Sequence, residues 1–327
     1  MNKLEKFVYD YLKHHPALKM KVRNIYLDIM DILPDYPSWF DGELMVKEGY
    51  FFGFHDQTPF SYNDDFILSH KLVIPLRMPL PKDPLIVGFW NKNFSEFEKI
   101  DTSYAWNYHK GCRLQWVNKD KYSFIFNTSI KEKLCSKIWN INDRSFKVID
   151  SPIDSVSPCG KLATSFSYER LEKFMPGYGY HYGDDSYISN SSPNKTGLYI
   201  VDLEKNISTM ICTIDQIAKI DQSKSSKKGR HYFTHTLFSP DSKRVAFLHR
   251  WVFDDDMAKR VSRLISCNID GSDIKVAPTT GMVSHYIWDD RNGLLAYCRI
   301  NDIDGHYLFK DSNFTNPKGL AINFLNS

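Results

Sequence analysis

The side chains best suited to chemistry are histidines and arginines that recur at one offset from large aromatic residues. His235, His285 and Arg113 each lie three positions before a phenylalanine or tryptophan in a short apolar segment. A neutral imidazole accepts a proton or binds a divalent transition metal, whereas a guanidinium group pairs with a carboxylate through two parallel hydrogen bonds. The pattern therefore predicts acid–base, metal-binding or carboxylate-binding chemistry.

Local catalytic motifs are absent, so the chemistry depends on residues that the fold brings together. The sequence contains no GxGxxG, GxxxxGK[ST], HExxH or GxSxG motif and no CxxC pair. No two carboxylates have a spacing that forces them together, so a glycosidase dyad is not predicted. The segment GYGYHYGDD has the composition of a loop and is not followed by a helix pattern, which argues against a nucleotide cradle.

A repeat that begins near Gly49 predicts the elements that position these side chains. An apolar anchor precedes a turn of Ser, Asn, Asp or Pro, then a second strand, then two more strand-like segments. The anchors of the five units are Phe60, Trp116, Val156, Phe238 and Trp288. Five four-stranded units in tandem predict an all-β fold, a β-propeller. A β-sandwich also contains many short strands, but it would not explain the same turn in the same four-strand frame.

The first strand of each propeller unit lines the central channel, so equal offsets from the anchors point in equivalent directions. The residues three positions before the anchors are Gln57, Arg113, Ile153, His235 and His285. The second strands run antiparallel to the first and therefore end at the same rim. The residues at their ends are His70, Asn127, His249 and Arg250. The long connections at residues 168–194, 254–256 and 301–306 are expected to open there. We therefore predict one funnel, lined by His231, His235, His249, His285, Arg113, Arg250, Tyr178 and Tyr180.

Composition limits the class of protein. The 327 residues are 42% hydrophobic and 15% aromatic, enough for a large core, and the net charge of +3 does not indicate a nucleic-acid partner. The six scattered cysteines are expected to be small buried side chains in a reducing compartment. The sequence shows no secretory signal and no apolar stretch long enough to span a membrane. We therefore expect a cytoplasmic protein.

Residues 1–48 form a separate N-terminal segment in this interpretation, and residues 49–327 form the propeller. Apolar residues at three- and four-residue spacing, including Ile25 and Ile29, predict an amphipathic helix that is broken near His15–Pro16 and ends by Pro34. We expect its Ile25/Ile29 face to pack on the propeller. A helix that docks onto a partner or a membrane surface is the alternative.

Five stretches resemble a known family: FGFHDQTPFS, AWNYHKGCRLQW, SPCGK with FSYERLEKFMPGYGY, HYFTHTLFSPDSKRVAFLHRW and DGSDIKVAPTTGMVSHYIWDD. They are similar to bacterial β-propeller proteins found among surface-polysaccharide genes, which are distantly similar to oligogalacturonate lyases. The resemblance runs from about Tyr50 to Asp311. It implies relatives with up to seven blades, whereas five repeats are visible here. It also implies a metal held by a glutamine and clustered histidines, whereas His285 stands alone in its repeat.

These observations predict a carbohydrate-active propeller, a lyase that cleaves a uronic-acid-containing bacterial glycan by β-elimination at the channel mouth. Removal of the C5 proton needs a base, and the carboxylate needs a metal or a guanidinium group to neutralise it. The candidate catalytic residues are His235, His285, Arg250 and Tyr178. The candidate substrate-binding residues are Arg113, Gln115, Arg170, Tyr180 and His55. The candidate metal ligands are His231, His235 and His285, for Mn, Ca or Zn.

Two alternatives stay open. A single histidine on a strand is more often a hydrogen-bonded core residue than a ligand, so the funnel need not hold a metal or a base. A glycan-binding or scaffold propeller in surface-polysaccharide assembly would need the same funnel without catalysis. In either case the expected ligand is a glycan or a sugar.

Overall fold

The structure is a computed structural model that describes residues 11, 15–30, 45–117, 122–183, 185–220, 223, 225–310 and 313–320. The chain divides into two compact units, residues 1–47 and 48–327. The boundary predicted from the sequence, between residues 48 and 49, lies next to this division. No helix in the described ranges is long and apolar enough to cross a membrane.

The first unit contains helix α2 (Pro16–Met30). It begins where the sequence predicts a break, and proline suits the first position of a helix because its missing N–H has no partner there in any case. The predicted end near Pro34 lies outside the described residues. Packing of the Ile25/Ile29 face on the second unit stays a prediction.

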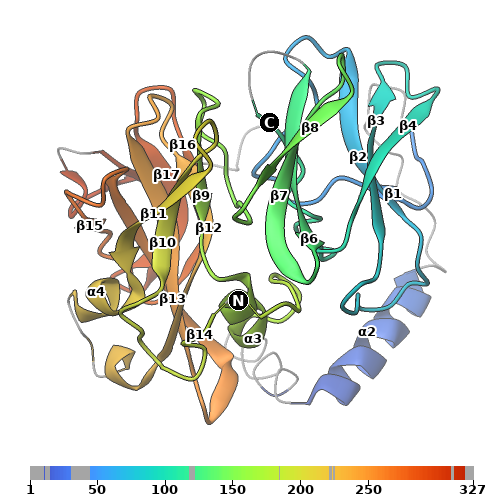
Figure 1. Cartoon of the computed structure of the whole chain (residues 1–327). Helices are drawn as coiled ribbons and strands as arrows, with labels where there is room; N and C mark the ends of the chain where they lie inside the picture. Colours follow the sequence, from blue (N-terminus) through green and yellow to red (C-terminus); the bar gives the residue numbers. More distant parts are fainter. Residues whose placement is uncertain are drawn as a thin grey trace. The chain divides into compact units, whose positions relative to one another are not determined.

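The second unit contains five antiparallel sheets that follow one another along the chain (Figure 1). The first sheet is β1 (Tyr50–Phe51), β2 (Phe66–Leu72), β3 (Leu85–Asn91) and β4 (Phe97–Ser103). The second is β5 (Gln115–Trp116), β6 (Ser123–Ile130), β7 (Lys133–Asn140) and β8 (Ser145–Ile149). The third is β9 (Leu162–Ser165), β10 (Gly197–Asp202) and β11 (Ile207–Thr213), with a bridge from Val156 to Ala163 supplying the inner fourth strand.

The last two sheets have the same meander order. The fourth is β12 (Arg230–Phe238), β13 (Arg244–Phe253), β14 (Asp256–Asn268) and β15 (Lys275–Val276). The fifth is β16 (Val283–Trp288), β17 (Leu294–Ile300), β18 (Ile303–Phe309) and β19 (Lys318–Leu320). Strands that pair only with their chain neighbours can be joined by short hairpins, which the sequence supplies as repeated polar turns.

The five predicted anchors occupy equivalent positions, which confirms the propeller prediction. Each anchor pairs with the second strand close to the first hairpin turn of its sheet. The pairs are Phe60 with Ile67, Trp116 with Phe124, Val156 with Ala163, Phe238 with Val245 and Trp288 with Leu294. The repeated turn in the sequence is therefore the innermost hairpin of each blade.

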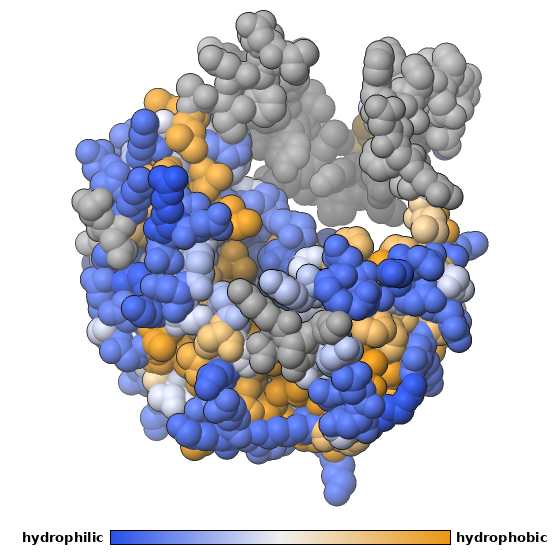
Figure 2. Space-filling model, turned by 90° about the horizontal axis from the view of Figure 1, so that it is seen from above, coloured by the Kyte–Doolittle hydropathy of each residue, from blue (hydrophilic) through white to orange (hydrophobic). Residues whose placement is uncertain are grey.

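Apolar clusters join each sheet to the next. For example, Val87 and Phe126 belong to the cluster between the first and second sheets, and Leu248 and Ala296 to that between the fourth and fifth. Seen from above, hydrophobic residues gather inside a mainly hydrophilic rim (Figure 2). The six cysteines are free thiols and five are buried, as expected for small apolar side chains.

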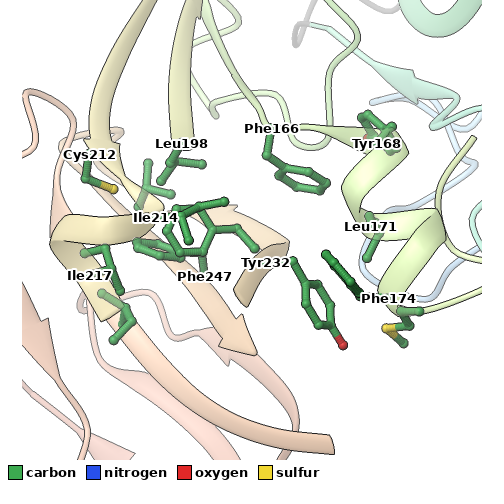
Figure 3. Packing of buried hydrophobic residues seen from close by; sticks show 14 of the residues in the cluster. Phe166, Tyr168, Leu171, Phe174, Leu198, Cys212, Ile214, Ile217, Tyr232 and Phe247 are labelled. Carbon is green, nitrogen blue, oxygen red and sulfur yellow. The ribbon is translucent and has the colours of Figure 1, made fainter. Parts of the chain in front are cut away.

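Two short helices complete the cluster between the third and fourth sheets (Figure 3). Helix α3 (Tyr168–Phe174) follows β9, helix α4 (Ile214–Lys219) follows β11, and the 3₁₀ turn η1 (Ser226–Lys228) precedes β12. The Ser167 hydroxyl caps α3 by accepting a hydrogen bond from the Arg170 backbone N–H, 3.0 Å away. This helix begins the long 168–194 connection that the sequence places at the channel mouth.

Candidate functional site

A bulge in the inner strands directs the candidate side chains. Arg113 and His235, at the same offset from their anchors, both have left-handed backbone, with φ of 55° and 53°. The β12–β13 register shifts between Thr234 and Leu237, and the β16–β17 register shifts between Val283 and Tyr286, around His285. A bulge leaves its extra residue outside the ladder and changes the direction of its side chain. Residues at the same offset from their anchors therefore lie where the inner strand departs from regular geometry.

Rings from the bulged strands β12 and β16 meet aromatic and imidazole rings from connecting segments in one chain of contacts. Phe54, ahead of the first sheet's anchor, has its ring centroid 5.0 Å from that of His235 and 6.3 Å from that of His285. The His55 ring lies 4.5 Å from His285. Tyr178 lies 6.1 Å from His235. We call this group, with His109, the aromatic rim.

His109 joins the aromatic rim through Tyr178, which comes from the connection after α3. Their rings stack with centroids 4.2 Å apart and an interplanar angle of 8°. His109 is exposed and Tyr178 is half-buried. Stacked ring faces with solvent access resemble the platforms on which aromatic side chains receive the apolar face of a ligand.

Arg250 on β13 is a buried cation beside this rim, and no carboxylate of a described residue pairs with it. Its side chain contacts the Met175 sulfur at 3.2 Å and the Val283 carbonyl oxygen at 3.5 Å. Its Nε makes no hydrogen bond with a described residue, and the residue is only 7% exposed. Burial lowers the pKa of Arg250, since removal of the charge from water is not offset by an anion.

Two of the rim histidines, His235 and His285, have lowered pKa values. Burial lowers the pKa of His235 well below its usual range, and the charges of Lys110 and Arg250 lower it further. Burial also lowers the pKa of His285, and the charges of His55 and Arg250 lower it further. The Thr234 hydroxyl lies 2.8 Å from His235 Nδ1, and no described residue bonds to its Nε2. A neutral imidazole beside a cation can accept a proton or a hydrogen bond from a ligand.

Arg113, a predicted substrate-binding residue, lies in a buried ion network. Its Nη atoms donate to the two carboxylate oxygens of Asp56 at 3.0 and 2.9 Å, and its Nε donates to the Asp154 carbonyl at 2.6 Å. Lys110 Nζ donates to Asp154 Oδ1 at 2.9 Å, with both side chains fully buried. Burial would raise the pKa of Asp154, but Arg113 and Lys110 lower it overall. This geometry favours a structural role for Arg113.

Three further predicted substrate-binding residues are also engaged by the protein. Gln115 bonds to the backbone of Arg113, Asp154 and Val156. Tyr180 is 2% exposed, and its hydroxyl accepts a hydrogen bond from Asn127 at 3.0 Å.

Arg170 is engaged at every nitrogen of its guanidinium group. It donates to the Asp185 carboxylate at 2.6 Å and to the carbonyls of Tyr187, Asn190 and His231. Its geometry, like that of Gln115 and Tyr180, favours a role in holding the connection and the inner strands together.

His231, a predicted metal ligand, has both ring nitrogens occupied. Arg263 Nε donates to His249 Nδ1 at 2.9 Å, His249 Nε2 lies 2.9 Å from His231 Nδ1, and His231 Nε2 lies 2.9 Å from the Ser226 carbonyl. Because the guanidinium only donates and the carbonyl only accepts, each neutral ring donates through Nε2. Burial lowers the pKa of His231 to about 4. The ring therefore offers no lone pair to a metal.

No group of three His, Cys, Asp or Glu side chains that could hold a metal occurs among the residues that the structure describes. His235 and His285 both contact Phe54, whose ring occupies part of the space near them. The set predicted for Mn, Ca or Zn, with His231 as its third member, is therefore not assembled as a ligand group.

The structure brings together all four predicted catalytic residues, His235, His285, Arg250 and Tyr178, with His55 beside them. Phe54 and His109 were not predicted as site residues. Both occur in stretches that carry the family resemblance, FGFHDQ and YHKG, just ahead of inner strands. Their position in these stretches, six and seven residues before the anchors Phe60 and Trp116, was the available signal.

Comparison with known proteins identifies the fold. No protein-family model matches the chain, and no curated protein matches its sequence. The structure of an oligogalacturonate lyase in complex with manganese has a TM-score of 0.56 and 13% identity, over 83% of this chain and 66% of that chain. This chain thus spans just under two thirds of that lyase.

Two other solved propellers are more distant. TolB from Acinetobacter baumannii has a TM-score of 0.40 and 9% identity, over 78% of this chain and 51% of that chain. Oligogalacturonate lyase from Vibrio parahaemolyticus has a TM-score of 0.39 and 10% identity, over 82% and 78%. At 13% identity, the similarity to the manganese complex of oligogalacturonate lyase shows the fold alone and leaves the chemistry to the site itself.

Proposed function

We propose that the aromatic rim binds a carboxylate-bearing sugar and that the protein cleaves its glycan by β-elimination. The observation that carries this proposal is the buried Arg250, which no described carboxylate neutralises. An unpaired buried charge is costly, and a bound carboxylate would remove that cost through charge-assisted hydrogen bonds. The fold shared with an oligogalacturonate lyase supports the reaction class by analogy.

The proposed reaction uses residues that lie together at the rim. Arg250 pairs with the uronate carboxylate and stabilises the charge that develops on it when the C5 proton leaves. His235 accepts that proton at Nε2, and the nearby carboxylate favours the charged imidazolium. The C4–O bond breaks as the C4=C5 double bond forms, and Tyr178 supplies a proton to the leaving oxygen. No step is assigned to a metal, since the described residues do not assemble a ligand group for one.

The direct test is incubation with uronate oligosaccharides of several linkages, followed by the ultraviolet absorbance of the unsaturated product. Arg250→Gln should lower kcat/KM by about 100-fold or more, because it removes the carboxylate partner. Arg299→Gln is the matched control, since Arg299 is exposed and pairs with Asp304 at the surface. Equal activity of Arg250→Gln and the wild-type protein would refute the proposed role.

A second candidate function is glycan binding without cleavage. The observation that favours it is the strongly lowered pKa of His235, which makes the free imidazole a weak base. In that case calorimetry would show uronate binding that depends on Arg250, no unsaturated product would form, and His235→Ala would leave affinity within about threefold of the wild-type value.

A further inference from the structure

A cavity of about 670 Å³ lies against the fifth sheet and opens from the aromatic rim. Its walls include Ile287, Leu295 and Tyr297 of the fifth sheet and Phe238 of the fourth. His55 and His285 belong both to this lining and to the aromatic rim. The volume is in the range of pockets for drug-sized ligands, about 300–1,000 Å³.

Part of the cavity wall is the face of the fifth sheet that does not pack against the fourth. Along β17, Leu294, Ala296 and Cys298 are buried against the fourth sheet, whereas Leu295 and Tyr297 alternate with them on the other face. Ile287 on β16 is 61% exposed on that face. The apolar wall is therefore accessible to a ligand in the described structure.

Three of the polar side chains around the cavity are engaged by the protein, whereas His55, His285 and His306 also belong to its lining. Trp288 Nε1 donates to the Leu237 carbonyl at 3.1 Å, and Tyr286 donates to the Ala246 carbonyl at 3.2 Å. Both oxygens of Asp56 accept from Arg113. A sugar placed against the apolar wall formed by Ile287, Leu295 and Phe238 would lose water from its hydroxyls with few replacement hydrogen bonds, which costs free energy. The walls thus suit hydrocarbon or an aromatic ring.

We propose that this cavity is a subsite for an apolar group, aromatic or acyl, attached to the sugar whose carboxylate pairs with Arg250. The inference rests on the proposed function, because it takes the rim as the uronate site. The preferred substrate is then a glycan or glycoside in which an acidic sugar carries an apolar substituent, with that substituent beside Ile287 and Tyr297.

The test compares 4-methylumbelliferyl β-D-glucuronide with methyl β-D-glucuronide, by calorimetry on the full chain. The aryl compound should bind at least about tenfold more tightly, because its ring leaves water. Ile287→Gln should reduce that preference by at least about threefold without changing the affinity for the methyl compound. Ile303→Gln, also exposed in the fifth sheet but outside the cavity lining, should change neither.

Equal affinity for the two glucuronides, or an unchanged preference in Ile287→Gln, would overturn the subsite. So would a wild-type dimer that Ile287→Gln converts to monomer in sedimentation, because a second copy would then cover the cavity. The neutral 4-methylumbelliferyl β-D-glucoside separates the two proposals. If it binds in an Ile287-dependent way while neither glucuronide responds to Arg250→Gln, the uronate site fails and the apolar pocket is supported.

Discussion

Buried neutral histidines should make the stability of this protein fall steeply between pH 7 and pH 5. His70 is fully buried, with Nδ1 3.2 Å from the Phe51 carbonyl and Nε2 3.2 Å from the Cys112 sulfur. Burial lowers its pKa from 6.5 to about 4, and burial does the same for His231. Both rings therefore stay neutral at pH 5 in the folded chain, whereas in the unfolded chain they are mostly protonated.

The sign and size follow from proton linkage. The unfolded state binds the proton first, so the stabilisation is fully present above the unfolded pKa and is lost as pH falls toward the folded pKa. With pKa values of 6.5 and about 4, each ring lowers the free energy of unfolding by about 2 kcal/mol between pH 7 and pH 5. The two together contribute about 4 kcal/mol.

Urea unfolding of wild type, His70→Gln and His231→Gln at both pH values measures this contribution. Each substitution should reduce the pH-dependent loss by about 2 kcal/mol, whatever it does to stability at pH 7. The exposed His181→Gln is the control and should keep the full loss, because its ring is solvated in both states. An unchanged pH dependence in both buried variants would refute the reasoning. So would NMR signals of the His70 and His231 rings that titrate near pH 6.5.

Two other substitutions test the interior around the channel. Asp154→Asn should lower the free energy of unfolding at pH 7 by about 3–5 kcal/mol, since it leaves the fully buried Lys110 without its anion; a loss below about 1 kcal/mol in urea titration would contradict this. Gly111→Ala should cost about 2 kcal/mol or more, because φ is +57° and the new Cβ would lie 2.3 Å from the His70 ring. Gly183→Ala, with no atom within 4 Å, should be near neutral by the same measurement.

The propeller was predictable from the sequence because its signals are local. Phe60, Trp116 and Trp288 each precede a polar turn and a second apolar strand, and this spacing recurs wherever an inner hairpin forms. The short helices were missed, although capping residues were present. Thr213 caps α4 through a 2.9 Å bond to the Gln216 backbone N–H, but a single cap before a six-residue helix is a weak signal.

The bulge explains why His235 and His285, which share one offset from their anchors, lie near each other in the structure. In a regular strand, side chains alternate between the two faces. This alternation does not predict that His235 and His285 contact the same ring, because the register shifts in both inner strands. Equal offsets were still informative, since the bulge recurs at the same place. The shared partner, Phe54, lies in the connection after β1 of the first sheet, so a comparison of the repeated strands could not find it.

Arg113 and Arg250 are both predicted from the sequence to line one funnel, but their surroundings differ in carboxylate groups. Asp56 and Asp154 surround Arg113, and the pKa of its guanidinium is raised despite burial because these anions outweigh the loss of water. No anion among the described residues compensates Arg250 in this way, so burial lowers its pKa. The spacing of charges along the chain does not encode this difference, since Asp154 reaches Arg113 from another sheet. A ligand carboxylate would give Arg250 the compensation that Arg113 already receives from the protein, and binding there would therefore also stabilise the fold.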